Sequence, residues 1–200
     1  YDELQPYFEQ AEHLWCVSGK ARQHAHHARQ EPTRDGYEFP MPPLRPHAHT
    51  ELITAAFAKA GMMPYLGARA INSQTHAGRP ACSFCGYCQF FGCPVNSRAN
   101  AVNTVLARAL ATGRCDLRTG HCVTRLVHEN GRIRGVMYKT EPGGPEHFLG
   151  ASRVLVSVQT IQSARLFLLS QIPDPNKLVG RYLTYHTKGN AELIFKNQPV

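Results

Sequence analysis

Four cysteines stand close together near the middle of the chain and constrain how this stretch can fold. They are Cys82, Cys85, Cys88 and Cys93, separated by two, two and four residues. A thiolate is a soft ligand, and spacings this short allow one loop to place its sulfur atoms around a single centre. The window therefore predicts an iron–sulfur site, a zinc site, or a compact loop that holds disulfides or free buried thiols.

The spacing leaves these three alternatives open. The bacterial ferredoxin run has three residues in its last gap, whereas four residues precede Cys93 here. A C-x2-C-x2-C arrangement is also tighter than the paired knuckles of most structural zinc sites. Because the chain has seven cysteines, an odd number, at least one of them lies outside any set of intramolecular disulfides.

The charge of the chain is positive but scattered. There are 22 Lys and Arg residues against 14 Asp and Glu, which gives a formal net charge of +8. No run of five or six basic residues occurs, so the clustered footprint of nucleic-acid binding is missing and an anionic cofactor is the better partner. No stretch approaches the roughly eighteen apolar residues of a transmembrane helix, so we expect no membrane span in this segment.

Two groups of histidines invite a metal-binding interpretation. The first is His24, His26 and His27, and the second is His47 and His49. Both groups lie in chain rich in proline and arginine, without a carboxylate or a thiol near them in the sequence. We therefore interpret them as solvated loop residues.

Apolar residues spaced as on one face of a helix predict four helical segments. Residues 20–47, between the first two, are rich in proline and are predicted to be irregular chain at the surface. Thr50 is a suitable N-cap and Gly61 a suitable end for the second helix, and Asn96 or Ser97 suits the start of the third. The predicted helices are residues 4–15, residues 50–61, a third that ends at Gly113, and a short one that Thr160 caps.

From residue 116 onward the apolar pattern changes to the alternation of β-strands. Glu-Asn-Gly at 129–131 and Pro-Gly-Gly-Pro at 142–145 are strong turn signals. The apolar run at 154–156 is typical of a strand buried on both faces. A three-stranded meander, a buried strand and a helix together predict a mixed α/β (α+β) fold, as in the inner part of a dinucleotide-binding domain. The predicted strands are residues 117–118, 123–128, 133–138, 148–149 and 154–158.

A series of short motifs runs through the chain in a fixed order. Gly-Arg-x-x-Gly-Val occurs at 131–136, Ser-Ala-Arg-Leu at 163–166, and Val-Gly-Arg-x-Leu-x-x-His at 179–186. Together they resemble the glucose–methanol–choline (GMC) oxidoreductase family. The cysteine window, which ends in Gly92-Cys93-Pro94, resembles the branch of gluconate, sorbitol and related sugar or polyol dehydrogenases.

This resemblance implies the central part of an FAD-binding fold of the GMC type, with a cysteine-rich loop among its helices. The intact protein would remove a hydride from a CH–OH group of a sugar, polyol or sugar acid, and FAD would accept it. Electrons would leave for a cytochrome or a quinone rather than oxygen, with an iron–sulfur cluster on the cysteine window as the relay. Such relatives are periplasmic or membrane-associated through a partner, and the sequence itself predicts no compartment.

The resemblance also divides the chain into three parts. Residues 1–95 would be a helical and loop region with the cysteine-rich segment, forming a lid and part of the substrate domain. Residues 96–170 would be part of the FAD-binding domain, and residues 171–200 would begin the substrate-binding domain.

The same resemblance implies cofactor contacts for four residues. The backbone at Val123 would contact the adenine end of FAD, and the turn of Val158, Gln159 and Thr160 would lie against the flavin. Relatives have Ala-Gly-Ala in this turn, where glycine allows a close approach of the backbone to the cofactor. The side chain of Gln159 would crowd the flavin, which raises the alternative of a decayed, inactive relative.

No catalytic residue is assigned within the chain. The resemblance places the glycine-rich phosphate loop before Tyr1 and the catalytic histidine after Val200, so we expect an internal fragment that is inactive alone. The alternative from a different class is a small electron-transfer or interaction module, with iron–sulfur or zinc on the cysteine window and without catalysis of its own.

Overall fold

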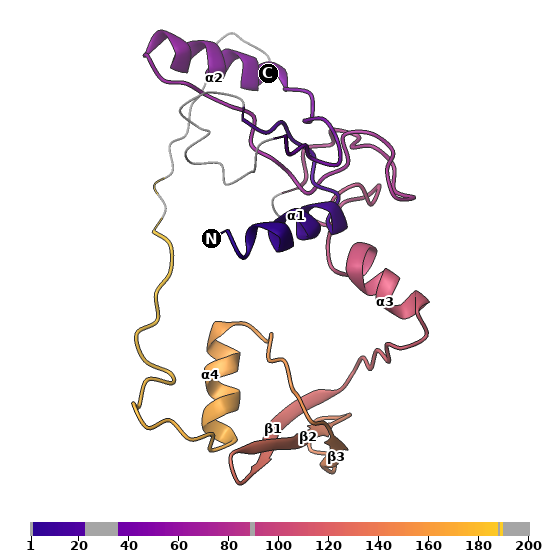
Figure 1. Ribbon diagram of the computed structural model, residues 1–200, viewed down its shortest axis with the longest axis vertical. Helices are drawn as coiled ribbons and strands as arrows, with labels where there is room; N and C mark the ends of the chain where they lie inside the picture. The colour runs from indigo at the N-terminus through magenta and orange to yellow at the C-terminus, as the bar shows by residue number, and fades with distance from the viewer. Residues whose placement is uncertain (1, 23–35, 89–90, 188, 190–200) are drawn as a thin grey trace. The chain divides into compact units, whose positions relative to one another are not determined.

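The structure is a computed structural model and describes residues 2–22, 36–88, 91–187 and 189. The chain divides into two compact units, with the boundary between Asp116 and Leu117. In the described ranges no helix is both long enough and apolar enough to cross a membrane. The first unit contains α1 (Gln5–Leu14), α2 (Ala48–Lys59), the π-helix η2 (Val102–Leu106) and α3 (Ala107–Ala111), and the second contains β1 (Cys122–Glu129), β2 (Arg132–Lys139), β3 (His147–Gly150) and α4 (Thr160–Leu169) (Figure 1).

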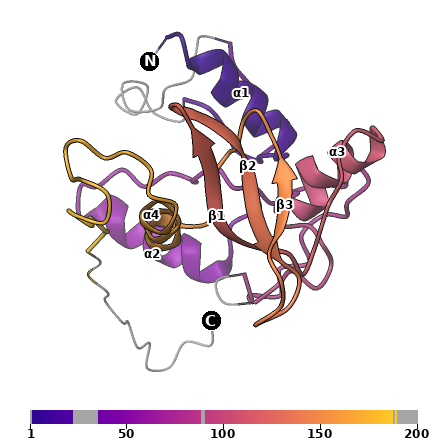
Figure 2. The ribbon, with the colours of Figure 1, turned by 90° about the horizontal axis from the view of Figure 1, so that it is seen from below.

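The second unit is built on an antiparallel meander with the strands in the order β1, β2, β3 (Figure 2). Asn130 and Gly131 join β1 to β2 with backbone φ angles of 50° and 73°, as a two-residue hairpin turn requires. Asn and Gly adopt this left-handed conformation at low cost. The three-stranded meander and its first turn are therefore as the sequence predicts.

Strands β2 and β3 approach each other closely at Gly135. A Cβ atom at this position would lie 2.1 Å from the carbonyl oxygen of Leu149, far inside contact distance. A Cβ atom at Gly150, the cross-strand partner of Gly135, would meet nothing nearer than the ring of Phe148 at 3.8 Å. The pairing of β2 with β3 thus depends on the absence of a side chain at Gly135.

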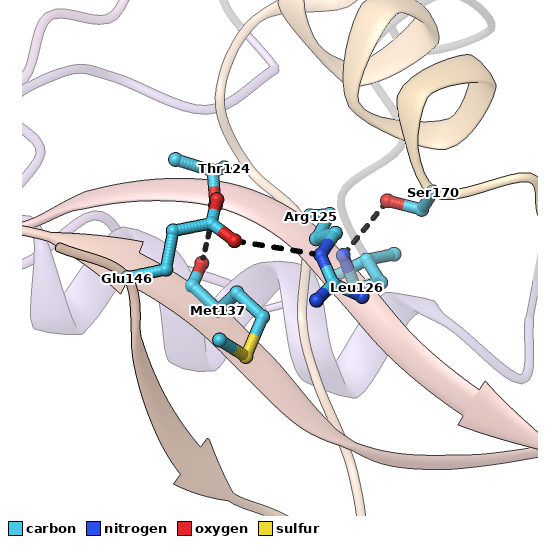
Figure 3. Close-up of polar contacts among 6 residues, drawn as sticks. All are labelled: Thr124, Arg125, Leu126, Met137, Glu146 and Ser170. Carbon is cyan, nitrogen blue, oxygen red and sulfur yellow. Dashed lines mark hydrogen bonds and ion pairs between the residues drawn. The ribbon is translucent and has the colours of Figure 1, made fainter. Parts of the chain in front are cut away.

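Helix α4 packs against β1 through both apolar and polar contacts. Leu126 of β1 and Leu166 of α4 are buried and form the small apolar core of this unit. The amide of Leu126 donates to the hydroxyl of Ser170 at 2.7 Å (Figure 3). That hydroxyl donates in turn to the carbonyl oxygen of Leu166 at 2.6 Å. The end of the helix is thereby fixed to the strand.

The buried strand predicted at 154–158 is wrong for this structure. These residues form none of the described strands, and the side chain of Leu155 is 98% exposed. The physical reason is that a strand of this type is stabilised by parallel neighbours on both sides, and the described residues supply none. The short strand predicted at 117–118 is also absent from the described strands.

Two predicted helix starts in the first unit are wrong. Helix α2 begins at Ala48, and its N-cap is His47 rather than the predicted Thr50. It ends as predicted before Gly61, where φ is 74°. The third helix is capped by Asn100, whose side chain accepts the amide of Asn103 at 3.0 Å while the Asn103 side chain accepts the amide of Asn100 at 2.8 Å. Such a reciprocal pair satisfies two amides that a helix start leaves free.

The core of the first unit lies in irregular chain. Its most completely buried side chains include a polar set, Ser18, Asn72 and Ser97, beside Met41. Ser18 forms bridges with both Met41 and Arg69 and so joins three separate segments. The prediction that residues 20–47 run over the surface is therefore wrong at Met41.

Candidate functional site

The cysteine window is a loop whose ends are held by a polar clamp, which we define as the buried side chains of Asn72, Arg79 and Ser97. The Arg79 guanidinium donates to the carbonyl oxygen of Ser97 at 3.0 Å, and the Ser97 hydroxyl donates to that of Ala81 at 2.8 Å. The amide of Cys82 donates to the carbonyl oxygen of Asn72 at 2.8 Å. The clamp fixes the start of the window against the segment that follows it.

Three of the four thiols line one cavity of about 780 Å³. They belong to Cys82, Cys85 and Cys88, which are half-buried and free. The sulfur of Cys82 accepts the amide of Phe84 at 3.3 Å, and Phe84 has a left-handed φ of 55°. The carbonyl oxygen of Cys88 accepts a hydrogen bond from the guanidinium of Arg98. These contacts curl the window around the cavity.

Cys93 is separate from the other three, because it does not line this cavity. Partial burial would raise the pKa of Cys93, but the backbone amides of the turn that follows it outweigh this effect and lower the pKa below the ordinary thiol value. An amide N–H stabilises the thiolate by donating a hydrogen bond to it. The amides belong to Arg98, Val95, Ser97 and Asn96.

The fit of the window to a metal centre can be judged from the side chains as they stand. The described residues contain no group of three or more His, Cys, Asp or Glu side chains placed to hold a metal ion. The window therefore does not fit an iron–sulfur or zinc centre in this arrangement, and we derive no step through one. All seven cysteines are free, so the disulfide alternative is wrong as well.

The second histidine group is exposed, as interpreted, but His49 lies in α2 rather than in a loop. His47 and His49 line the same cavity as Cys82, Cys85 and Cys88, so thiols do lie near them. Because the histidines and the cysteines are far apart in the sequence, no sequence signal could have predicted that they line one cavity. The first group, His24, His26 and His27, lies outside the described residues.

The predicted cofactor residues all lie in the second unit. Val123 is on β1 with its side chain 40% exposed, and Val158, Gln159 and Thr160 form the turn into α4. In the described part of the chain no hydrogen bond joins Val123 to this turn. Ser170, just after the end of α4, forms the hydrogen bonds with β1. A ten-residue helix is about 15 Å long, so the turn lies at the other end of the helix.

Gln159 has a conformation that bears on the predicted crowding of a flavin. Its φ is 75°, a left-handed value that glycine adopts most easily. Its side-chain oxygen accepts the amides of Ile161 at 3.0 Å and of Gln162 at 3.4 Å, which makes Gln159 rather than Thr160 the N-cap of α4. The side chain is thus folded over the start of its own helix.

A small polar network lies next to Val123 on β1. The Thr124 hydroxyl lies 2.6 Å from a carboxylate oxygen of Glu146 and 3.3 Å from the carbonyl oxygen of Met137, and Arg125 lies 3.7 Å from the other carboxylate oxygen (Figure 3). The Thr124 hydrogen bond has the largest effect on the pKa of Glu146 and lowers it; burial opposes this effect, and the charges of Arg125 and Lys139 lower the pKa further. The network ties β1 to the start of β3.

Comparison with known proteins identifies the family of this chain. The meander, the helix that follows it and the short helices of the first unit are compatible with an FAD-binding domain. The sequence matches the GMC oxidoreductase family over residues 1–188, and the chain belongs to that family. The matching region is the family's N-terminal, FAD-binding domain. The resemblance of the sequence motifs is confirmed.

Individual relatives are similar over most of this chain. It is 28% identical to 2-methyl-1,2-propanediol dehydrogenase of Mycolicibacterium austroafricanum, across 93% of this chain and 34% of that protein. It is 26% identical to the gluconate 2-dehydrogenase flavoprotein of Pantoea cypripedii, across 98% and 35%. It is 29% identical to paromamine 6'-oxidase of Streptomyces fradiae, across 91% and 33%. The chain spans about a third of the length of these curated relatives.

Proposed function

We propose that the intact protein is an FAD-dependent oxidoreductase that acts on a CH–OH group of a sugar, polyol or sugar acid. The observation that carries this proposal is the family match over residues 1–188. The names of two relatives, a propanediol dehydrogenase and a gluconate dehydrogenase flavoprotein, support an alcohol- or sugar-type substrate. FAD supplies a hydride acceptor when bound, and the part of this chain is to bind and orient it.

Within the chain, the proposed cofactor contacts are the backbone of Val123 and the turn of Val158, Gln159 and Thr160. The conformation of Gln159 supports a fit, because its backbone takes the left-handed value that a glycine would supply. Its side-chain oxygen is bound to the first amides of α4. This folding argues against the crowding that motivated the alternative of a decayed relative.

We also propose the functional division predicted from the sequence: residues 1–95 as a lid and part of the substrate domain, 96–170 as part of the FAD-binding domain, and 171–200 as the start of the substrate-binding domain. The proposal assigns no catalytic residue to this chain, so the 200 residues alone should be inactive.

For the electron acceptor we propose a cytochrome or a quinone rather than oxygen. The names of two relatives, both dehydrogenases, support this acceptor, whereas the name of a third relative, paromamine 6'-oxidase, favours oxygen. The cysteine window does not support transfer of electrons to this acceptor through a metal relay, because the described thiols are not placed around one metal centre. Anaerobic turnover with a quinone analogue, compared with oxygen uptake, decides the point, and equal or faster oxygen uptake contradicts it.

The proposal is tested first by the flavin content and visible spectrum of the full-length protein that contains this chain. Bound flavin at one per chain, bleached by gluconate or sorbitol, is the expected result. Iron or zinc without flavin would instead support the thiol-ligated module. A protein that binds neither flavin nor metal would support the decayed relative.

The contact of the turn with the cofactor is tested by placing bulk at Gln159. We expect Gln159→Phe to lower the flavin content strongly, whereas Gln159→Gly keeps it, because glycine retains the backbone conformation. Gln162→Phe is the matched control, since Gln162 is an exposed residue of the same helix. Equal flavin content in the two phenylalanine variants would place the cofactor elsewhere.

A further inference from the structure

The cavity beside the cysteine window is lined by four basic side chains and by no acidic one. The basic residues are Arg45, His47, His49 and Arg69. The carboxylate nearest in sequence is Glu51 in the first turn of α2, which is exposed and does not line the cavity. A cavity with one sign of charge and low-dielectric walls concentrates ligands of the opposite charge. The four basic residues are clustered at this cavity, whereas the positive charge of the rest of the chain is scattered.

Two of the basic groups are held at the cavity by the same aromatic ring. The guanidinium carbon of Arg45 lies 4.2 Å from the centre of the Phe84 ring. The imidazole of His47 meets that ring edge to face, with the ring centres 5.1 Å apart, and stacks on His49 at 5.3 Å. A cation above an aromatic face is stabilised there without losing its charge. The ring therefore positions the Arg45 charge without neutralising it.

The fourth basic group is positioned by its backbone. Arg69 exchanges two backbone hydrogen bonds with Ser18, of 2.8 Å and 2.9 Å, and Ser18 is 1% exposed. Among the described residues neither Arg45 nor Arg69 pairs with a carboxylate. Both guanidiniums keep free donors, which match the oxygens of a carboxylate or a phosphate in bidentate geometry.

We propose that this cavity binds a small organic anion that carries a carboxylate or a phosphate group. The guanidiniums of Arg45 and Arg69 would hold the charged group, and the remainder of the ligand would lie against Phe84 and Ile71. The cavity volume of about 780 Å³ is within the range of sites for small organic ligands. This site is additional to the proposed flavin contacts, which lie in the second unit of the chain.

The thiols supply the readout for a test. Cys82, Cys85 and Cys88 line the cavity, whereas Cys122 is an exposed thiol on β1 and serves as an internal control. The full chain is labelled with a thiol-alkylating reagent in the presence of gluconate, of inorganic phosphate, of sorbitol, or of sodium chloride at matched ionic strength. Mass spectrometry then gives the labelling rate of each cysteine.

We expect gluconate or phosphate to protect the cavity thiols and to leave Cys122 unchanged. At a ligand concentration about ten times the dissociation constant, labelling of the cavity thiols should slow by about tenfold. The comparison of gluconate with phosphate identifies which anionic group is preferred. Equal protection by sorbitol or by sodium chloride, or protection of Cys122 as well, would overturn the proposal.

Variants assign the effect to the guanidiniums. Arg45→Ala combined with Arg69→Ala should abolish protection, the corresponding lysine pair should retain part of it, and Arg132→Ala on β2 should leave it intact. Trp15 fluorescence, which reports on the first unit, verifies that each variant is folded. Protection that survives in the folded double alanine variant would contradict an anion site. Protection by zinc alone, without any effect of the anions, would show a metal site instead.

Discussion

The two units of this chain are stabilised by different kinds of interaction. The meander satisfies its backbone groups through its own ladder, and the buried side chains of its unit are the apolar Leu126 and Leu166 with one polar residue, Ser170. The first unit has few regular elements, and several of its most buried side chains are polar. Irregular chain cannot pair its own backbone groups, so side chains must do so wherever that backbone is buried.

This difference indicates which amino-acid substitutions should destabilise each unit. In the first unit one side chain, such as that of Arg79, satisfies the two adjacent carbonyl oxygens of Asn96 and Ser97, which lie 17 and 18 residues further along the chain. In the meander the backbone carries the pairing, and most side chains can change as long as the strands still fit together. We therefore expect loss of a polar side chain to damage the first unit, and gain of bulk to damage the second.

The largest effect is expected for Arg79→Ala. The Arg79 guanidinium donates to the carbonyl oxygens of Ser97 at 3.0 Å and of Asn96 at 3.5 Å, and the residue is 5% exposed. Hydrogen bonds to a charged donor contribute about 1.5–3 kcal/mol each, so the free energy of unfolding should fall by about 3–5 kcal/mol. Urea unfolding followed by Trp15, the single tryptophan of the chain, reports on the first unit.

Arg134→Ala is the matched control in the meander. Arg134 is exposed and pairs with Glu129 at 3.1 Å, and a surface pair of this kind contributes at most about 1 kcal/mol. If the Arg79 and Arg134 variants lose the same stability, the buried polar clamp does not stabilise the first unit as argued.

A smaller effect is expected for Gly135→Ala in the meander. The new Cβ atom would meet the carbonyl oxygen of Leu149 at 2.1 Å, so β2 and β3 must separate. Overpacking of this kind costs about 1–3 kcal/mol, and a backbone neighbour that cannot rotate away puts the cost at the upper end. Gly150→Ala, with no neighbour nearer than 3.8 Å, should be close to neutral. Far-UV circular dichroism during thermal unfolding distinguishes the two, and a neutral Gly135→Ala would disprove the close approach.

The smallest effect is a pH dependence at Glu146. Its pKa is lowered, chiefly by the Thr124 hydroxyl, so its contribution to stability is complete above the ordinary glutamate pKa and is lost as the pH falls through the lowered value. Glu146→Gln should therefore lower the melting temperature slightly at neutral pH, and the difference should shrink as the pH falls below the ordinary glutamate pKa. A difference that grows in acid would contradict the sign.

The features that the sequence predicted well are those encoded over short distances. The alternation of strands β1 and β2 and the Asn130-Gly131 turn need only neighbouring residues, and both are confirmed. The GMC motifs are also local, and the family match confirms them. Helix starts were predicted less well. Asn96 and Ser97 are also suitable capping residues, but the third helix is capped by Asn100 through its reciprocal pair with Asn103.

The features that the sequence did not predict depend on contacts between distant segments. The sequence offers Ser97 as a helix cap, but this residue is buried in the polar clamp with Asn72 and Arg79. The meeting of His47 and His49 with the cysteine window depends on the same long-range packing. The cofactor contacts of Val123, Val158, Gln159 and Thr160 remain predictions, because they concern a molecule that the chain alone does not contain.

The exposed run at residues 154–158 has a consequence for how this chain behaves in a concentrated solution. Its three valines belong to none of the strands in the described part of the chain, and Leu155 is almost fully exposed. Unpaired backbone of this composition is a template on which another chain can add a strand. Arg153, directly before the run, adds a charge that opposes such stacking. A second copy is then the nearest available partner, and self-association will rise with concentration unless another segment covers the run first.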